Sequence, residues 1–201
     1  MEEGEKNLVA DTAGKEKEPE PEPEERLSFE PTEDELVLHF LRPQLRGFEP
    51  RVPGAVVEEA DPCAVPPWEL LARHGLLERG RGYFFAARRR GTTHVRRTPA
   101  GGAGSWMHSG NREQGRSVTA LGVVARWCRT RYYFYEVGGG AGRRSTGWVM
   151  AEYEITDPGC YRRADEGEED EYWVLCHVRR SSIRTAGGGG KTPPSRRRVL
   201  V

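Results

Sequence analysis

The sequence predicts a mainly β protein of the α+β class, in which an antiparallel sheet follows a few short helices. Three observations favour this class. A capping box opens an amphipathic helix near residue 32, aromatic and β-branched segments recur between glycines from residue 82, and no long helical periodicity appears after residue 75. Because parallel strands need long crossovers, the short spacings indicate an antiparallel sheet over about residues 82–180.

The first helix is expected in "PTEDELVLHFL". Thr32 and Glu35 have the spacing of a capping box, and acidic residues fill the first turn, where the helix dipole favours them. One apolar face is formed by Leu36, Val37, Phe40 and Leu41. Pro43 is expected to close this helix, which should cover about residues 32–41.

A second short helix is expected in "PPWELLARHG". Pro66 or Pro67 suits its first turn, where a missing backbone N–H costs nothing. Gly75 suits its end, because glycine readily adopts the left-handed conformation that closes helices.

Five segments are predicted to be strands, because aromatic and β-branched residues fill them and glycines separate them. They are residues 82–88, 123–129, 131–137, 147–155 and 171–180. The third and fourth, joined by "GGGAGRRSTG", indicate a hairpin whose tip carries Arg143 and Arg144. Trp106, Trp148 and Trp173 are expected near the core of the sheet.

Composition divides the chain into three parts. Residues 1–26 are rich in Glu and Pro with little to bury, which predicts a disordered acidic tail. Residues 27–181 hold nearly all the aromatic residues and should form the folded domain. Residues 182–201 return to Gly, Pro and Arg, and are expected to be a flexible basic tail.

The formal net charge is zero, but charge is strongly segregated. Residues 1–26 contain ten acids and four bases, whereas residues 73–147 contain fifteen arginines and three acids. Such a local excess of positive charge indicates a polyanionic partner. Arginine outnumbers lysine 27 to 4. Arginine binds phosphate bidentately, although a GC-rich coding sequence would also favour it, and both explanations stay open.

Several other classes of protein are disfavoured. No apolar run reaches the roughly 18 residues of a membrane span, and the acidic start lacks a signal peptide's apolar region, so an intracellular protein is expected. The four cysteines, Cys63, Cys128, Cys160 and Cys176, form no CxxC pair, which argues against a zinc knuckle or a disulfide framework. His177 should face away from Cys176 on a strand. No metal or cofactor is predicted, and no catalytic motif indicates an enzyme.

Seven motifs follow one another along residues 27–181: "FEPTEDELVLHFL", "DPCAVPPWEL", "YFFAARRR", "GSWMHSG", "YYFYE", "GWVMAEYEI" and "EYWVLCHV". In this order they resemble the plant NAC domain, a DNA-binding module of transcription factors. The resemblance implies a strongly twisted antiparallel sheet flanked by a few short helices. It also implies a nuclear protein that binds double-stranded DNA as a homodimer or as a heterodimer with other NAC-domain proteins.

The family's Trp-Lys-Ala-Thr-Gly strand, which enters the DNA major groove, corresponds to Trp106, Met107, His108, Ser109 and Gly110. Tryptophan would fix this strand against the body of the domain, and glycine would let the backbone approach DNA closely. The family's lysine is a methionine here, which can touch a thymine methyl group but cannot donate to guanine. The phosphates are expected to be held by Arg88, Arg89, Arg90, Arg96, Arg97, Arg112, Arg129, Arg143 and Arg144.

The resemblance also implies a dimer interface in the segment before the first helix, expected to include Arg26, Leu27, Ser28 and Phe29. The family pairs an arginine with a glutamate there. The glutamate corresponds to Glu35 and the arginine position is Ser28. Because residues two apart on a strand share a face, Arg26 is a candidate substitute. Self-pairing and pairing with a relative that supplies the arginine are both left open.

Three hypotheses follow for function. The first is a DNA-binding regulator of transcription. The second is an interaction protein that keeps the fold, pairs with relatives and modulates them while binding DNA poorly; the short segment after residue 181 favours it, because family members usually carry a long regulatory region there. The third, an enzyme, lacks support, since "GGGAG" at residues 138–142 is a hairpin tip without a following helix or lysine.

Overall fold

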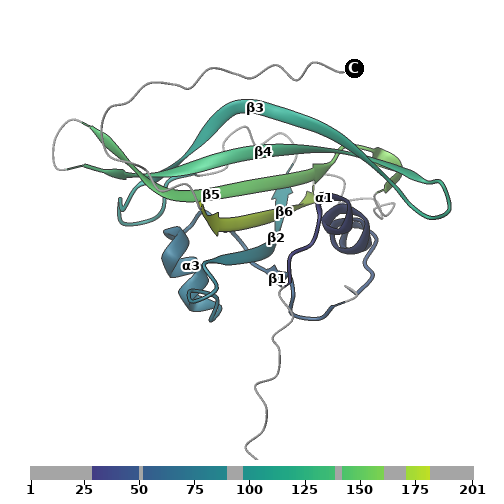
Figure 1. Ribbon diagram of the computed structural model, residues 1–201, viewed down its shortest axis with the longest axis horizontal. Helices are drawn as coiled ribbons and strands as arrows, with labels where there is room; N and C mark the ends of the chain where they lie inside the picture. Colours follow the sequence, from purple (N-terminus) through teal and green to yellow (C-terminus); the bar gives the residue numbers. More distant parts are fainter. Residues whose placement is uncertain (1–28, 50–51, 90–96, 139–141, 161–170, 182–201) are drawn as a thin grey trace, which may run out of the picture. The chain divides into compact units, whose positions relative to one another are not determined.

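The computed structural model describes residues 29–49, 52–89, 97–138, 142–160 and 171–181 (Figure 1). For Arg89, Pro158 and Glu171 it describes the backbone alone. The chain divides into two compact units, Met1–Glu30 and Pro31–Val201. The elements below all belong to the second unit.

A six-stranded sheet dominates the second unit, with the strand order β1-β2-β6-β5-β4-β3. Its strands are β1 Val57–Glu58, β2 Arg81–Arg89, β3 Ser105–Val118, β4 Val124–Val137, β5 Arg143–Ile155 and β6 Glu171–Arg180. The predicted mainly β fold is confirmed. One pairing differs from the prediction: the two-residue strand β1 lies parallel to β2, with Val57 opposite Phe84, so the sheet is mixed.

The strands from β3 to β5 are longer than the sequence predicted. The predicted segments 123–129 and 131–137 are one continuous strand, β4. Arg143 and Arg144 lie in β5, opposite Val137 and Glu136, and not at the hairpin tip. The pairing of long antiparallel neighbours extends regular strand geometry into polar residues that would not form strands by their own propensity.

The first helix runs from Glu33 to Leu45 as three consecutive pieces: α1 Glu33–Glu35, the π-helical turn η1 Leu36–Leu41, and α2 Arg42–Leu45. The predicted capping box is confirmed, with bonds between Thr32 and Glu35 in both directions. The prediction that Pro43 closes the helix was wrong. The Arg42 N–H bonds the Val37 carbonyl in the wider i→i−5 pattern, and this π turn gives the proline ring room that a regular α-helix lacks.

The second predicted helix is confirmed as α3 Pro67–Arg73, with Gly75 at φ +66° beyond its end. A short 3₁₀ turn, η2, covers Pro158–Cys160. None of the helices in the described ranges is long and apolar enough to span a bilayer.

Both faces of the sheet carry buried side chains. On one face, Trp106, Phe134, Trp148, Met150 and other apolar residues pack with α3 in a single core cluster. On the other face, the cross-strand row of Phe85, Leu175 and Tyr153 lies where η1 contacts β5 and β6. In Figure 1, α3 lies to the left and α1 to the right of strands β1 and β2, below the long strands β3, β4 and β5.

The tryptophan predictions are confirmed for Trp106 and Trp148, whereas Trp173 is half-buried and lies outside that cluster.

The four cysteines are free thiols and all are buried. As expected from strand alternation, Cys176 lies in the core cluster and His177 turns to the other face, where its ring stacks on Tyr83 at 4.3 Å between centroids.

Candidate nucleic-acid interface

Strand β3 is the last strand in the sheet order, so its outer side has no strand beside it among the described residues (Figure 1). A bulge interrupts its pairing with β4. His108 lies opposite Tyr132 and Arg112 opposite Thr130, so three β3 residues, 109–111, face one β4 residue. Gly110, at the centre, has φ +87° and open space around the position of a Cβ. The bulge thus pushes a short loop of backbone outward from the sheet edge.

Local hydrogen bonds hold the bulge in place. The Gly110 N–H donates to His108 Nδ1 at 3.0 Å, and the Asn111 N–H donates to Ser109 Oγ at 3.4 Å. Because Nδ1 accepts a hydrogen bond, a neutral His108 ring carries its hydrogen on Nε2. This exposed side chain can therefore donate a hydrogen bond to an acceptor outside the protein.

Trp106 anchors the beginning of β3. Its side chain is only 3% exposed and meets Phe134 edge to face at 5.2 Å between centroids. Its backbone N–H donates to the Arg97 carbonyl at 2.8 Å. Met107 follows on the opposite face, where it is 36% exposed and lies opposite Tyr133. The Arg143 guanidinium lies 3.2 Å from Met107 Sδ, which places a cation beside this exposed strand.

Two of the predicted phosphate-binding arginines point into the domain. Arg97 forms two hydrogen bonds to the Glu152 carboxylate, both at 3.2 Å, and Arg88 Nη2 reaches Glu152 Oε2 at 3.3 Å. Arg97 also donates to Tyr132 Oη at 3.0 Å and lies over the Tyr132 ring. The Arg88 side chain is only 6% exposed. These contacts place Arg88 and Arg97 in a buried ion cluster around Glu152.

The buried cluster shifts the pKa values of its members. Burial alone would lower the pKa of Arg97, but the charge and hydrogen bonds of Glu152 raise it above its usual value. Burial raises the pKa of Cys63 to about 11 and that of Tyr132 to about 12. Both groups therefore stay neutral at physiological pH, and the charges in the cluster belong to the arginines and their carboxylate.

Other predicted arginines on the sheet also hold carboxylates. Arg112 Nη2 lies 2.7 Å from Glu154 and also donates to Cys128 Sγ. Arg144 pairs with Glu136 at 2.9 Å. Arg129 forms ion pairs with Glu33 and Glu113. The side chain of Arg89, and all of Arg90 and Arg96, lie outside the described residues.

The predicted dimer residues are only partly described. Arg26, Leu27 and Ser28 lie outside the described residues, and Phe29 belongs to the first unit. Glu35 is exposed, and its Oε2 accepts hydrogen bonds from the Thr32 N–H at 2.7 Å and the Thr32 hydroxyl at 2.9 Å. Hydrogen bonding to the Thr32 backbone and hydroxyl lowers the pKa of Glu35, which keeps this carboxylate charged.

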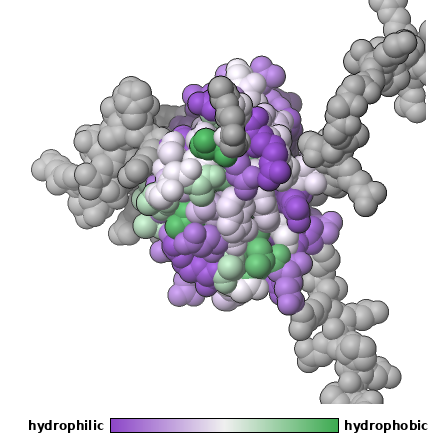
Figure 2. Space-filling model, turned by 90° about the vertical axis from the view of Figure 1, so that its left-hand side faces the viewer, coloured by the Kyte–Doolittle hydropathy of each residue, from purple (hydrophilic) through white to green (hydrophobic). Residues whose placement is uncertain are grey.

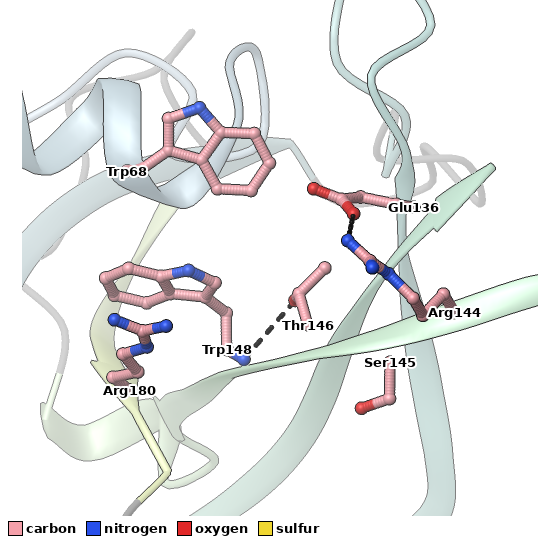
Figure 3. A pocket seen from close by; sticks show the side chains of 7 residues that line it. All are labelled: Trp68, Glu136, Arg144, Ser145, Thr146, Trp148 and Arg180. Carbon is pink, nitrogen blue, oxygen red and sulfur yellow. Dashed lines mark hydrogen bonds and ion pairs between the residues drawn. The ribbon is translucent and has the colours of Figure 1, made fainter. Parts of the chain in front are cut away.

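A hollow of about 620 Å³ lies at the end of the sheet near α3 (Figure 3). Trp68 of α3 and Trp148 of β5 line one side of it, and the Glu136–Arg144 ion pair lines the other. Figure 2 shows the side of the molecule on which α3 lies, where hydrophilic residues surround small separate apolar patches. Among the predicted site residues that the structure describes, Arg144 alone borders the hollow.

Sequence reasoning missed Glu152, the residue that organises the buried arginines. The signal available was strand alternation, because Glu152 comes two residues after the buried Met150 and must share its inward face. A carboxylate on an inward face needs a cationic partner.

The fold and this strand define a class of protein, a small mainly β domain that exposes one edge strand bordered by arginines. Residues 23–155 match the family described as No apical meristem (NAM) protein, which is more than half of the chain. The chain therefore belongs to this family, that of the NAC-domain proteins, and the resemblance drawn from the seven motifs is confirmed.

Curated relatives agree with this assignment. NAC domain-containing protein 92 of Arabidopsis thaliana is 28% identical over 171 residues, 83% of this chain and 54% of that protein. NAC domain-containing protein 2 of Oryza sativa subsp. japonica is 31% identical over 157 residues, 75% and 46% of the two chains. NAC transcription factor 56 of Arabidopsis thaliana is 28% identical over 159 residues, which cover 75% of this chain and 42% of that protein. The chain spans about half the length of these relatives.

Proposed function

We propose that this protein is a DNA-binding regulator of transcription that acts in the nucleus. The observation that carries the proposal is strand β3, an outer strand anchored at Trp106 and bulged outward at residues 109–111. The DNA major groove admits a β-strand or ribbon, and base edges there offer hydrogen-bond acceptors and thymine methyl groups. Membership of the NAC-domain family and a relative named as a transcription factor support the same function.

In this proposal the exposed residues after Trp106 face the bases. Met107 contacts a thymine methyl group, while His108 Nε2 and the Ser109 hydroxyl donate to base acceptors. Trp106 acts indirectly, since it holds the strand against the core. Exposed Arg143, beside Met107, contacts phosphate.

The remaining arginines divide according to their surroundings. Arg144, Arg112, Arg89, Arg90 and Arg96 are proposed as further phosphate contacts. Because Arg88, Arg97 and Arg129 hold carboxylates and are at most 20% exposed, their proposed role is to position the strands that carry the DNA contacts.

Dimerisation belongs to the proposal as well. Arg26, Leu27, Ser28 and Phe29 would meet the same segment of a second NAC domain, either a copy of this chain or a relative. Glu35 would accept an arginine of the partner. Both of its hydrogen bonds to Thr32 use Oε2, so Oε1 is the oxygen proposed for that ion pair.

Salt-dependent DNA binding tests the proposal. The full chain is titrated with a labelled duplex of family type and with random duplex at two salt concentrations, as wild type and as Arg143→Ala/Arg144→Ala. The double variant should bind both duplexes more weakly and with a shallower log–log salt slope, by about 0.9 for each phosphate that is no longer neutralised. Arg46→Ala, which removes an exposed arginine at the end of α2, should behave as wild type. Salt-insensitive binding, or a double variant equal to wild type, would refute the proposal.

One observation favours the second function, a partner that modulates relatives while binding DNA poorly. Met107 stands where the family has lysine, and Arg112, Arg129 and Arg144 already hold carboxylates. A chain of this kind would form mixed dimers whose affinity for DNA lies below that of the relative alone. Mixing this chain with a DNA-bound relative and following the duplex anisotropy distinguishes the two functions.

A further inference from the structure

The end of the β3–β4 hairpin exposes a group of aliphatic side chains. We call residues 114–126 the β3–β4 arm, which extends past helix α1 in Figure 1. Leu121 at its turn is 91% exposed, and the exposed fractions of Val118, Val123 and Val124 are 52%, 45% and 37%. Aliphatic residues exposed singly are ordinary on protein surfaces, but four gathered at one tip indicate a docking surface.

The turn that carries Leu121 is ordered. The Gly122 N–H donates to the Thr119 carbonyl and the Thr119 N–H donates to the Val123 carbonyl, both at 2.9 Å. The Val123 N–H donates to the Thr119 hydroxyl at 3.0 Å. Gly122 adopts φ +77°, a conformation that glycine allows at no steric cost. Leu121 is therefore held outward by a closed turn, and a partner would not have to order it.

Two arginines face each other next to this tip. Arg116 lies directly opposite Arg126 in the pairing of β3 with β4. Like charges in this position repel and weaken a sheet. Within the described residues no carboxylate lies within ion-pair distance of either guanidinium, in contrast to Arg112, which holds Glu154. Among the described residues, Arg116 and Arg126 therefore form an exposed pair of like charges at a cost to the stability of the sheet.

The arginine pair and part of the apolar tip share one face of the arm. Val118 lies opposite Val124, and this row follows the row of Arg116 and Arg126 by two residues on each strand. Side chains two residues apart on a strand point the same way and lie about 7 Å apart. A partner must therefore bring negative charge and, about 7 Å away, apolar surface.

Two other occupants fit this arrangement poorly. A second copy of the arm would place arginines against arginines in a symmetric contact. Nucleic acid would match the arginines, but its phosphate-rich backbone offers little apolar surface for four aliphatic side chains. The arm is also separate from the proposed reading segment at the start of β3, because Val118 lies seven positions beyond Asn111 on the strand, a distance of about 24 Å.

From these observations we infer that the β3–β4 arm is a docking surface for an acidic protein segment that carries aliphatic side chains. Aliphatic residues of the partner cover Leu121 and the neighbouring valines. Carboxylates of the partner bind Arg116 and Arg126 and remove the repulsion between them. The surface goes beyond the proposed DNA-binding function, because it gives the chain a protein partner at a different place on the same strand.

A peptide titration tests this inference. The probe is a fluorescein-labelled synthetic peptide in which glutamate and leucine occupy opposite faces of a helix, and its counterpart has glutamine in place of glutamate. Fluorescence anisotropy with the full chain should show binding of the acidic peptide and at least about tenfold weaker binding of the glutamine peptide. Leu121→Ser and Arg116→Gln/Arg126→Gln should each weaken binding of the acidic peptide by about tenfold.

Matched controls locate the surface. Leu77→Ser removes another half-exposed leucine, and Arg143→Gln removes an arginine near Met107; both should bind the acidic peptide as wild type does. The inference is overturned if the acidic peptide does not bind, if the arm variants bind it normally, or if both peptides bind equally.

Two further measurements separate this surface from DNA binding and from a structural role. The arm variants should bind duplex DNA within about twofold of wild type, whereas a tenfold loss would mark the arm as a DNA contact instead. The melting temperature should not fall in Arg116→Gln/Arg126→Gln, because the variant relieves a like-charge pair. A lower melting temperature would show that the arginines stabilise the fold and would contradict the inference.

Discussion

Arginine has opposite roles in two regions, the interior around Glu152 and the beginning of β3 around Met107. In the interior, Arg88 and Arg97 converge on one carboxylate and are largely buried. Beside Met107, Arg143 is exposed, and its guanidinium lies 3.2 Å from a thioether sulfur. The same residue type therefore stabilises the fold in one place and leaves an exposed positive charge in the other.

This difference shows why charge counted along the sequence overstates the charge that a partner meets. Residues 73–147 hold fifteen arginines and three acids. The carboxylates that neutralise several of these arginines come from outside this stretch, namely Glu33, Glu152 and Glu154. Long-range pairing of strands and of the first helix brings them together, so only the fold tells which arginines remain available.

The largest effect expected from this comparison is the loss of the buried carboxylate. Glu152→Gln removes the charge that compensates Arg88 and Arg97, and breaking a buried pair from one side costs about 3–5 kcal/mol of unfolding free energy. Glu136→Gln, which breaks the exposed pair with Arg144, should change stability by less than about 0.5–1 kcal/mol. Urea unfolding of the two variants measures the difference. Equal losses would mean that burial does not separate the two kinds of arginine.

A second effect concerns the interior and pH. Burial, followed by the charges of Arg179 and Arg81, lowers the pKa of His177 from 6.5 to about 4. The unfolded chain therefore binds a proton as pH falls through 6.5, while the folded chain stays neutral there until about pH 4. The neutral His177 therefore contributes to the free energy of unfolding above pH 6.5, and roughly 3 kcal/mol of this contribution is lost as the pH falls from 6.5 to about 4.

His177→Gln is the variant that isolates this titration. Its unfolding free energy should fall less steeply than that of wild type between pH 7 and pH 4, as measured by urea unfolding at several pH values. If the unfolding free energies of wild type and His177→Gln changed with pH in parallel, His177 would have the same pKa in the folded and unfolded chain.

A smaller effect is expected at the bulge of the exposed strand. Gly110→Ala forces an alanine into a positive φ and should cost about 1 kcal/mol. Gly102→Ala is a matched control, because Gly102 has φ +72° and open space but precedes the strand. Both variants should lose similar stability in thermal melts, while only Gly110→Ala should weaken DNA binding. If Gly110→Ala and Gly102→Ala bound DNA equally well, the bulge would have no part in DNA binding.

The sequence predicted the fold where local signals were strong. The capping box at Thr32 and the proline-led helix at Pro67 formed as expected, and so did the aromatic strands, except that two predicted segments are one strand, β4. The features that the sequence did not predict depend on neighbouring segments of the same chain. The helix passes Pro43 because a π turn precedes it, and the polar second half of β3 is extended because β4 pairs with it.

The candidate site was predictable only in part. The exposed strand was located through the resemblance of residues 106–110 to the family's Trp-Lys-Ala-Thr-Gly strand. Which arginines lie beside it could not be predicted, because Arg88 and Arg97 turn inward only where Glu152 of a distant strand meets them. The bulge at Gly110 likewise follows from register between two strands.

The central claim, that the strand beginning at Trp106 contacts DNA bases, is tested most directly by Met107→Lys. Duplex titrations of the full chain should show tighter binding of the variant, more so for a family-type site than for random DNA, because lysine donates to guanine N7 and O6. Thermal melts should be nearly unchanged, since Met107 is exposed. If affinity and preference both stay at wild-type values while the fold is intact, the strand does not contact the bases and the claim is contradicted.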